Sequence, residues 1–453
     1  MLALPVLVGA ASVLMGTLDS HFGLGGVAIT KTSPGSDPDF QTGLDVQRDG
    51  KVVVGGESYM GEEAGGFQWR ITRYTRDGAP DPVFGSAGTA LTNMSSVGGF
   101  DERLVSLAVQ DDGRIVAAGW ILTTPDTQNS ALARYNPDGT LDTSFGDQGI
   151  VVTNVASEPD HDFINQVLID ATGRIVVSGG CRRIFVGRYL PDGSLDPSFN
   201  VNGPRPGLAL TEIAPAGETN SELLGMAIDD QGRIVAGGYS TFFDGASFRV
   251  SSAVVRFLPS GILDPSFNST GARPGTVITP MVPDGQWNVA FRVAIDRQGR
   301  ILTAGDAFVG VGAGLYDIAL ARYLPNGTLD SSFGNSGIVL TNAGPGDSDD
   351  DAQGLAIQPN GAILVGGSAA PTAFTLDSDF MVARFRPNGS LDTSFGQGGI
   401  ATTPTAPGDA DDEILAMALQ GGSHLVATGE CDQPATGRNV CVVRYNLEGG
   451  SAR

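Results

Sequence analysis

The stretch from Leu104 to Asn154 decides the fold: LVSLAVQDDGRIVAAGW, a variable segment, and then ALARYNPDGTLDTSFGDQGIVVTN. It holds four short runs that alternate in polarity or are rich in β-branched residues, and turn sequences separate them. The first two runs meet across Asp111-Asp112-Gly113, where glycine supplies the positive φ of a tight hairpin turn. The third run leads through Pro137-Asp138-Gly139 to Leu141 and Phe145 and then to the fourth run. We therefore expect each unit to be a four-stranded antiparallel sheet, with the Leu and Phe filling space between or beneath sheets.

Three anchors trace this unit along the chain, and each of them occurs in seven copies. The Gly that opens the second run is found at Gly50, Gly113, Gly173, Gly232, Gly299, Gly361 and Gly422. The Arg of the third run is found at Arg73, Arg134, Arg188, Arg256, Arg322, Arg384 and Arg444. The aromatic residue of the L-D-x-S-F-G segment is found at Phe22, Phe84, Phe145, Phe199, Phe267, Phe333 and Phe395.

The two ends of the chain hold complementary parts of one unit. The chain starts with only a fourth strand, GGVAIT at Gly25–Thr30, and stops after a third strand at Tyr445. A four-stranded sheet cannot bury both faces alone, so the copies must stack, and a closed ring removes the free edges. We predict an all-β, seven-bladed β-propeller over residues 16–453, closed by strand 25–30 joining the C-terminal blade. An open β-solenoid is the alternative.

The repeat also carries a family likeness. ARYNPDGTLDTSFGDQG and its copies, each following a GRIVVSGG-type strand, resemble the delta-60 repeat, a bacterial β-propeller repeat. The resemblance covers the chain beyond residue 15 and implies a propeller, often within large exported or surface proteins, with no established activity. Two copies depart from the pattern, because Asn200 and Asn268 replace Gly and an Arg-Pro-Gly extends each connection. We expect a bulkier rim at those two blades.

The composition limits the partners. Fifty acidic residues against 27 Lys and Arg give a net charge of -23, which repels phosphate backbones and anionic lipid head groups. Nucleic acid is therefore excluded as the expected partner. The same charge suits cations or a basic partner, although solubility of an exported or salt-exposed protein explains it equally.

The first 15 residues form a separate segment. Met1 to Met15, MLALPVLVGAASVLM, is apolar and uncharged, and is shorter than the about 20 residues that span a bilayer. It ends in small residues and is typical of the core of a secretion signal, although the usual basic leader is missing. We expect a secreted, periplasmic or cell-surface protein without a transmembrane span; a buried arm is the alternative.

The three cysteines agree with export. Cys431 and Cys441 flank one short loop, CDQPATGRNVC, and we expect a disulfide there that leaves Cys181 over. A bridge around so small a loop contributes on the order of 2 to 3 kcal/mol, mainly by restricting the unfolded chain. A pair of reduced, half-buried thiols is the alternative.

The two faces of the predicted ring differ. Connections one-to-two and three-to-four are nearly identical in all blades, whereas connections two-to-three and four-to-one vary in length and reach long stretches at 239–252 and 306–317. Binding sites belong on such variable loops over a rigid frame. An exposed aromatic patch near Trp69, Phe242, Phe243 or Trp287 would favour binding.

The four-to-one loops are acidic in most blades and are expected near the axis. Clustered carboxylates offer the oxygens that calcium prefers, and a calcium site is one interpretation. Solvated loops whose Asp side chains cap exposed amides are the other interpretation. The metal candidates are Asp347, Asp349, Asp351, Asp409, Asp411 and Glu413. The EF-hand pattern fails at Ala352 and Gln358, where Gly and Glu would be required.

Other functional signatures are missing or have structural explanations. The seven strand-three Arg residues are in register with the Asp of L-D-x-S-F, and we expect bidentate structural ties. His21, His161 and His424 have no metal-ligand spacing, and no nucleophile elbow, phosphate loop or dinucleotide fingerprint occurs. We therefore favour a monomeric binding or scaffold module for a glycan, a protein or an envelope component. The alternative is a propeller hydrolase or lactonase that uses loop-face carboxylates, with or without calcium.

Overall fold

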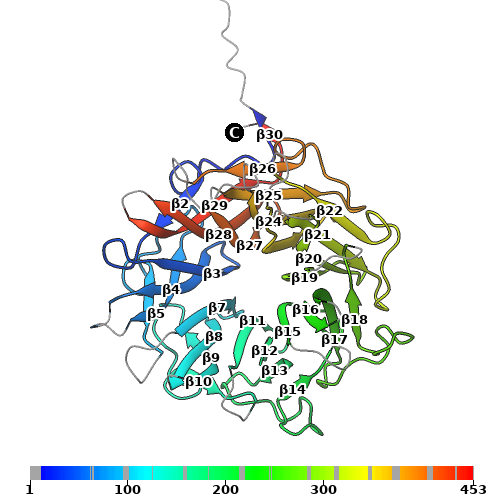
Figure 1. Ribbon diagram of the computed structural model, residues 1–453. Helices are drawn as coiled ribbons and strands as arrows, with labels where there is room; N and C mark the ends of the chain where they lie inside the picture. Colours follow the sequence, from blue (N-terminus) through cyan, green and yellow to red (C-terminus); the bar gives the residue numbers. More distant parts are fainter. Residues whose placement is uncertain are drawn as a thin grey trace, which may run out of the picture.

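The chain forms a ring of seven four-stranded antiparallel sheets around a central channel, in the computed structural model (Figure 1). The structure describes residues 12–451 apart from 62, 64–65, 95–101, 125, 157–160, 182, 214–219, 244, 246, 283–286, 311–315, 345–348, 370–377, 406–411 and 434–435. Every named element among these residues is a β-strand. The prediction of a seven-bladed propeller with four antiparallel strands in each blade is confirmed.

Each blade has its strands in the order of the chain, and we number the blades along the sequence. Blade 1 consists of β3 (Asp39–Val46), β4 (Val52–Tyr59), β5 (Phe67–Tyr74) and β6 (Thr89–Thr92). Blade 2 consists of β7 (Glu102–Val109), β8 (Ile115–Thr124), β9 (Thr127–Tyr135) and β10 (Ile150–Thr153). Blade 3 consists of β11 (Phe163–Ile169), β12 (Ile175–Gly180), β13 (Ile184–Tyr189) and β14 (Leu208–Thr211).

The remaining blades follow the same plan, except that blade 7 takes one strand from the N-terminal region. Blade 4 consists of β15 (Asn220–Ile228), β16 (Ile234–Phe243), β17 (Phe248–Phe257) and β18 (Thr276–Thr279). Blade 5 consists of β19 (Arg292–Ile295), β20 (Ile301–Phe308), β21 (Tyr316–Tyr323) and β22 (Ile338–Thr341). Blade 6 consists of β23 (Gly354–Ile357), β24 (Ile363–Ala369), β25 (Asp379–Phe385) and β26 (Ile400–Thr403). Blade 7 consists of β27 (Glu413–Gln420), β28 (His424–Gln433), β29 (Gly437–Asn446) and β2 (Val27–Thr30).

The ring closes as the sequence predicts. β2 pairs antiparallel with β29, with Val27 opposite Val443 and Thr30 opposite Val440. A further small pair joins β1 (Ser12–Val13) to β30 (Gly450–Ser451). The carbonyl oxygen of Met15 accepts a hydrogen bond from the Gly396 amide at 3.0 Å, so contacts to the ring begin before residue 16. Residues 1–11, which hold most of the signal-like segment, lie outside the described residues.

Apolar side chains between neighbouring blades form the core. The first strand of each blade lines the channel, and the fourth lies at the outer edge (Figure 1). The Phe of each L-D-x-S-F segment, or of its variant, is fully buried in all seven copies. The prediction that these residues fill space between the sheets is therefore confirmed.

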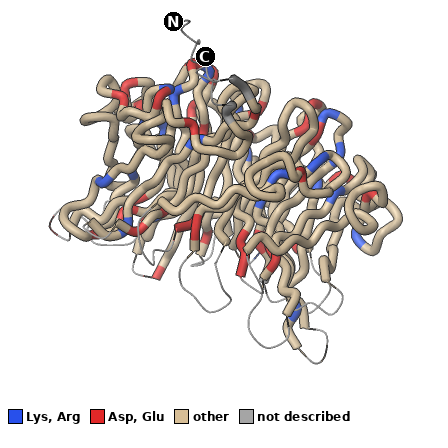
Figure 2. The backbone as a smooth tube through the Cα atoms, turned by 90° about the horizontal axis from the view of Figure 1, so that it is seen from above, with Lys and Arg blue, Asp and Glu red and all other residues tan. Residues whose placement is uncertain are grey.

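The connections follow the predicted two-face arrangement, with differences in detail. We call the face with connections one-to-two and three-to-four the turn face, and the other the loop face; Figure 2 shows the ring from the side. The expected long loop 239–252 is largely strand, because β16 continues to Phe243 and pairs there with Phe248. In the first turn of blade 7, the residue with a positive φ is Gly421 and not Gly422, the glycine that the repeat pattern predicts. This turn joins Gln420 to His424. Among the described residues, no helix is long and apolar enough to cross a membrane.

Candidate binding site at the mouth of the channel

The strand-three Arg residues are structural ties, as predicted, although their geometry differs from the prediction. Arg188 Nε lies 2.7 Å from Asp196 Oδ2, while its Nη2 donates to Ser198 Oγ at 3.1 Å. Its Nη1 donates to the carbonyl oxygen of Pro259 in the next blade at 2.6 Å, and the guanidinium lies 4.7 Å from the Phe199 ring centre. The carboxylate of Asp196 thus accepts from one guanidinium nitrogen and the hydroxyl of Ser198 from a second. The predicted bidentate pair would have joined both nitrogens to the carboxylate. Ion pairs at the same place join Arg73–Asp81, Arg134–Asp142, Arg256–Asp264, Arg322–Asp330, Arg384–Asp392 and Arg444–Asp19.

Many acids of the four-to-one loops cap backbone amides. The Asp39 carboxylate accepts from the Thr32 and Ser33 amides at 2.7 and 3.1 Å, and Asp39 has no exposed surface. In this contact, a buried side chain accepts a hydrogen bond from a backbone amide six to eight residues earlier in the chain and so fixes the link between two blades. The same contact is made by Glu102, Asp162, Asn288, Asp350 and Asp412.

Of the six predicted metal ligands, the structure describes Asp349, Asp351 and Glu413. Asp347, Asp409 and Asp411 lie outside the described residues. Asp349 Oδ1 accepts from the Tyr316 amide at 3.0 Å. Asp351 and Glu413 do come together and share a side-chain hydrogen bond. In the part of the chain that the structure describes, no group of three or more His, Cys, Asp or Glu side chains has metal-binding geometry.

One glycine of the second strand recurs in all seven blades and approaches the first strand closely. A Cβ added at this glycine would lie only 1.7–2.0 Å from a carbonyl oxygen of strand one, so no other residue fits. The glycines are Gly56, Gly119, Gly179, Gly238, Gly305, Gly367 and Gly429.

Beside this uniform backbone feature, the chemistry changes from blade to blade. The residue after each glycine faces the strand-one residue that supplies the carbonyl, and together these fourteen residues encircle the loop-face end of the channel; we call them the mouth ring. The members on the strand-one side are Phe40, Arg103, Phe163, Glu222, Val289, Asp351 and Glu413, of which Val289 and Asp351 lie just before β19 and β23. The strand-two members are Glu57, Trp120, Gly180, Tyr239, Asp306, Ser368 and Glu430.

Blades 5, 6 and 7 form an acidic sector of the mouth ring. Asp351 shares side-chain hydrogen bonds with both Asp306 and Glu413. Burial and the neighbouring Asp351 raise the pKa of Asp306 well above its ordinary value, and the same causes raise the pKa of Glu413 to about 10. Glu413 therefore holds a proton at neutral pH. Arg292 of blade 5 reaches the Leu415 carbonyl of blade 7 at 2.9 Å and covers the channel end of this sector.

Blades 7, 1, 2 and 3 form a mixed sector around a cavity of about 560 Å³. Phe40, Trp120 and Phe163 contribute aromatic surface to it. Two ion pairs border it: Arg103 Nε lies 3.1 Å from Glu57 Oε1, and Arg438 Nη1 lies 2.9 Å from Glu430 Oε2. Burial raises the pKa of Glu57 to about 7 against the opposing effect of Arg103.

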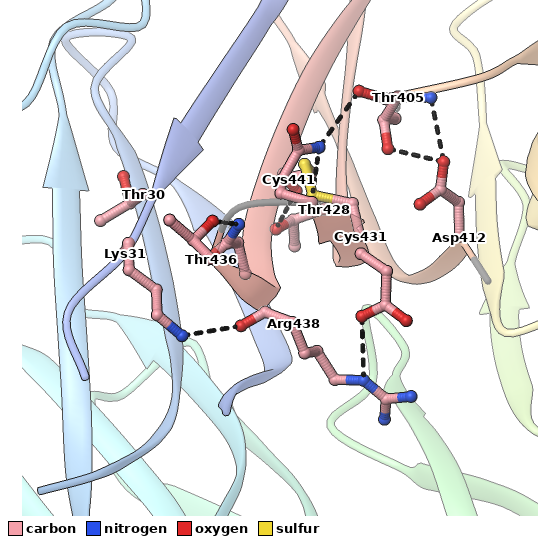
Figure 3. Close-up of a disulfide and its surroundings, with 12 residues drawn as sticks. Thr30, Lys31, Thr405, Asp412, Thr428, Cys431, Thr436, Arg438 and Cys441 are labelled. Carbon is pink, nitrogen blue, oxygen red and sulfur yellow. Dashed lines mark hydrogen bonds and ion pairs between the residues drawn. A yellow bond between two sulfur atoms is a disulfide. The ribbon is translucent and has the colours of Figure 1, made fainter. Parts of the chain in front are cut away.

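The hairpin that carries Glu430 and Arg438 is braced covalently. Cys431 and Cys441 form a disulfide in the structure, with their Cα atoms 5.9 Å apart (Figure 3). Cys181 is buried and is not part of this bridge. Cys431 directly follows Glu430, and Lys31 of the N-terminal region donates to the Arg438 carbonyl at 3.2 Å (Figure 3). The bridge therefore lies directly behind the mouth ring.

The aromatic residues proposed from the sequence for a surface patch differ in their exposure. Trp69 is fully buried in the core, because its strand-three side chain points between blades 1 and 2, so it cannot form part of a surface patch. Phe243 and Trp287 are 53% and 39% exposed, and Trp287 lies over Tyr239 with ring centres 6.4 Å apart. The sequence did not single out Trp120, Tyr239, Phe40 or Phe163.

The histidines take no part in the mouth ring. His21 and His424 both contact Asp19, at 3.1 and 3.3 Å, because ring closure brings the two ends of the chain together. His161 forms a backbone bridge with Gln128.

The fold and this site define a closed seven-bladed β-propeller with a polar and aromatic mouth. Six segments match the family model "Domain of unknown function (DUF5122) beta-propeller": residues 47–84, 110–145, 170–199, 232–267, 299–333 and 358–395. Each segment runs from the first turn of one blade to its buried Phe, and the corresponding part of blade 7 is divided between the chain ends. These six segments of the chain thus resemble the β-propeller repeat that this family model describes.

Several solved structures are similar to this chain at low sequence identity. They include a protein of unknown function from Dyadobacter fermentans, with 11% identity over 98% of this chain and 100% of that chain and a TM-score of 0.46. Drosophila semaphorin 1b has 8% identity over 95% and 88% of the two chains, with a TM-score of 0.41. A gluconolactonase from Xanthomonas campestris has 14% identity over 80% and 95%, with a TM-score of 0.33. No curated protein matches the sequence, and no function is taken from these likenesses.

Proposed function

We propose that this propeller is an exported binding module whose ligand enters the mouth of the channel on the loop face. The mouth ring carries the proposal. Its backbone is the same in seven blades, down to one glycine, whereas its side chains include acids, an Arg, aromatic rings and a Ser. Positions that serve the fold repeat one residue, as the strand-three Arg does. Side chains that differ over a uniform frame are typical of ligand recognition.

The cavity of the mixed sector favours a small polar ligand, or a group that projects from a larger one, over a flat protein surface. Its volume of about 560 Å³ falls within the roughly 300–1,000 Å³ of small-molecule pockets. Aromatic rings beside paired charges suit a glycan or an envelope component that carries one. A nucleic acid is disfavoured by the net charge of -23.

Export is supported by the apolar segment Met1–Met15 and by the disulfide, since disulfides persist in oxidising compartments. Fractionation of cells with N-terminal sequencing of the mature chain tests it. Protein found only in the cytoplasm with Met1 retained would contradict export.

The binding proposal is tested on a glycan array with full-length protein and two variants. A double variant Trp120→Ala/Tyr239→Ala removes the strand-two aromatics of the mouth ring. Arg48→Ala alters an exposed ion pair with Asp111 on the turn face and serves as the control. Binding that is lost in the double variant and kept in Arg48→Ala supports the proposal, and binding that survives in the double variant contradicts it.

A hydrolase is the second candidate, because the acidic sector holds Glu413, whose raised pKa of about 10 keeps its carboxyl group protonated at neutral pH. A protonated Glu413 is suited to act as a general acid toward a glycosidic or ester oxygen, with a second carboxyl group of the sector as base. A hydrolase panel with wild-type protein and Glu413→Gln tests this candidate. Turnover that falls at least about a hundredfold in Glu413→Gln supports it; no turnover, or turnover unchanged in the variant, removes it.

Calcium remains the metal to test, at the sequence-predicted residues Asp347, Asp349, Asp351, Asp409, Asp411 and Glu413. Carboxylate oxygens are the ligands that calcium prefers. Binding predicts that millimolar calcium raises the melting temperature and that Asp351→Asn abolishes the rise. No shift, together with no metal in the purified protein, would exclude the site.

A further inference from the structure

The cavity of the mixed sector is built from side chains of several blades. Its wall includes Phe40 of blade 1, Trp120 of blade 2 and Phe163 of blade 3, all half-buried. Gln128 of blade 2 and Asn165 of blade 3 add amide groups. A ligand here contacts apolar ring surface on one side and hydrogen-bonding groups on the other.

The charged groups of this cavity are arranged as ion pairs. Glu57 pairs with Arg103, Glu430 pairs with Arg438, and the third acid of the wall, Glu413, shares a side-chain hydrogen bond with Asp351. The two guanidinium groups still face solvent, because the Arg103 and Arg438 side chains are 48% and 39% exposed. An anionic ligand would meet Glu430 and the net negative charge of the protein, and a cationic ligand would meet two Arg residues. An uncharged ligand with several hydroxyl groups avoids both penalties, since a hydroxyl accepts from Arg and donates to Glu.

The aromatic wall selects among uncharged ligands. The rings offer flat apolar surface, and Arg438 lies 5.8 Å from the centre of the Phe40 ring, which keeps that ring in place. A pyranose has an apolar C–H face and a rim of hydroxyl groups. It matches a site in which rings lie beside Arg–Glu pairs.

We infer that this cavity holds one uncharged sugar ring of a glycan, packed against Trp120, with its hydroxyls between the Arg103–Glu57 and Arg438–Glu430 pairs. The inference rests on the proposed function and names its ligand class and its sector. Phe248 supplies the control, because it is an aromatic residue at the start of β17, its side chain is 59% exposed, and it lies outside both the mouth ring and this cavity.

The test is calorimetric titration of the full chain with neutral gluco-, manno-, galacto- and xylo-oligosaccharides and with oligouronates of matched length. At least one neutral oligosaccharide binds, and its uronate counterpart binds at least about tenfold more weakly. Trp120→Ala weakens binding at least about tenfold, as the loss of an aromatic anchor does, whereas Phe248→Ala stays within about twofold. Glu430→Gln, which keeps the size of the side chain, weakens binding by about five- to tenfold. Melting curves establish that each variant is folded.

The outcomes separate this inference from the proposed function. Preference for oligouronates, with dependence on Trp120, overturns the uncharged ligand and leaves the mouth as the binding site. Binding of a neutral oligosaccharide that is unchanged in Trp120→Ala overturns the sector. Absence of binding to every neutral oligosaccharide overturns the inference, while another ligand that is lost in the double variant would still support the proposed function.

Discussion

The amide of Gly16 donates to the carbonyl oxygen of Asn446 at 2.8 Å, although the two residues lie near opposite ends of the chain. In blade 2 the corresponding turn, between strand three and the buried Phe, is one continuous piece of chain. There the amide of Gly139 donates to the carbonyl oxygen of Asn136 at 2.9 Å. Gly16 has a φ of 84° and Gly139 a φ of 89°. The two ends of the chain therefore rebuild the turn between strand three and the buried Phe in blade 7.

Closure extends to the neighbouring blade. Leu447 takes the place of the turn proline, and its carbonyl accepts from Arg384 Nη1 at 3.0 Å. Met15 takes the place of the turn Asp, and its carbonyl accepts from the Gly396 amide. Blade 6 thus binds both chain ends, and the ring has no free edge at this point.

The ion pair between Asp19 and Arg444 is predicted to stabilise this closure. Asp19 Oδ2 lies 2.6 Å from Arg444 Nη2, and both side chains are at most 9% exposed. Because Asp19→Ala leaves a buried guanidinium without its partner, we expect a loss of about 3 kcal/mol in the free energy of unfolding. Denaturant titration measures it. Asp111→Ala, at an exposed pair with Arg48, should cost below about 1 kcal/mol; equal effects would contradict a special role for closure.

The repeated glycine of strand two is predicted to tolerate no side chain. A Cβ at Gly119 would lie 1.9 Å from the Arg103 carbonyl oxygen, so Gly119→Ala must move one strand. We expect a destabilisation of at least about 2 kcal/mol, measured by thermal or chemical unfolding. Gly422→Ala meets no atom within 4 Å and should be nearly neutral. If the two variants behave alike, the close approach of the strands is not what fixes this position.

Glu57 is predicted to make stability fall as the pH rises from about 4.5 to about 7. Its folded pKa is raised from 4.5 to about 7 by burial, so the folded state binds more protons than the unfolded state in this window. Glu57→Gln carries no charge at any pH and should be more stable than wild type by up to roughly 3 kcal/mol at pH 8. The gain should vanish near pH 4. A gain that does not vary with pH would contradict the raised pKa.

Thiol counting is predicted to find one reactive cysteine in the denatured, non-reduced protein. Cys181 supplies that thiol if Cys431 and Cys441 are bridged. Three thiols would exclude the bridge. Cys431→Ala/Cys441→Ala should lower the free energy of unfolding by about 2 to 3 kcal/mol, and Cys181→Ser provides the comparison without a bridge.

The sequence contains enough information for the fold because every blade repeats it. The turn glycines, the strand-three Arg and the buried Phe each occur seven times, and the divided seventh copy predicts closure at Tyr445. The site is harder to predict, since a mouth-ring residue such as Trp120 resembles any other strand residue within one copy. The position becomes visible only when the seven copies are aligned. The glycine of strand two is then the same in every copy, and the residue directly after it differs from copy to copy.

The acidic loops show why the roles of individual carboxylates are hard to predict from the sequence. Asp39, Asp350 and Asp412 are acids of these loops, and each is buried and accepts from backbone amides six to eight residues earlier, a contact that only the folded link between blades reveals. Asp306 and Glu413 lie more than a hundred residues apart, and they share Asp351 only because blades 5, 6 and 7 are consecutive in the ring.

A crystal structure of the protein with its tightest-binding oligosaccharide tests the central claim most directly. The account predicts seven blades around one axis and ligand density in the loop-face mouth, with a sugar ring against Trp120 and beside Glu430. Density for the ligand on the turn face or on the outer strands would contradict it.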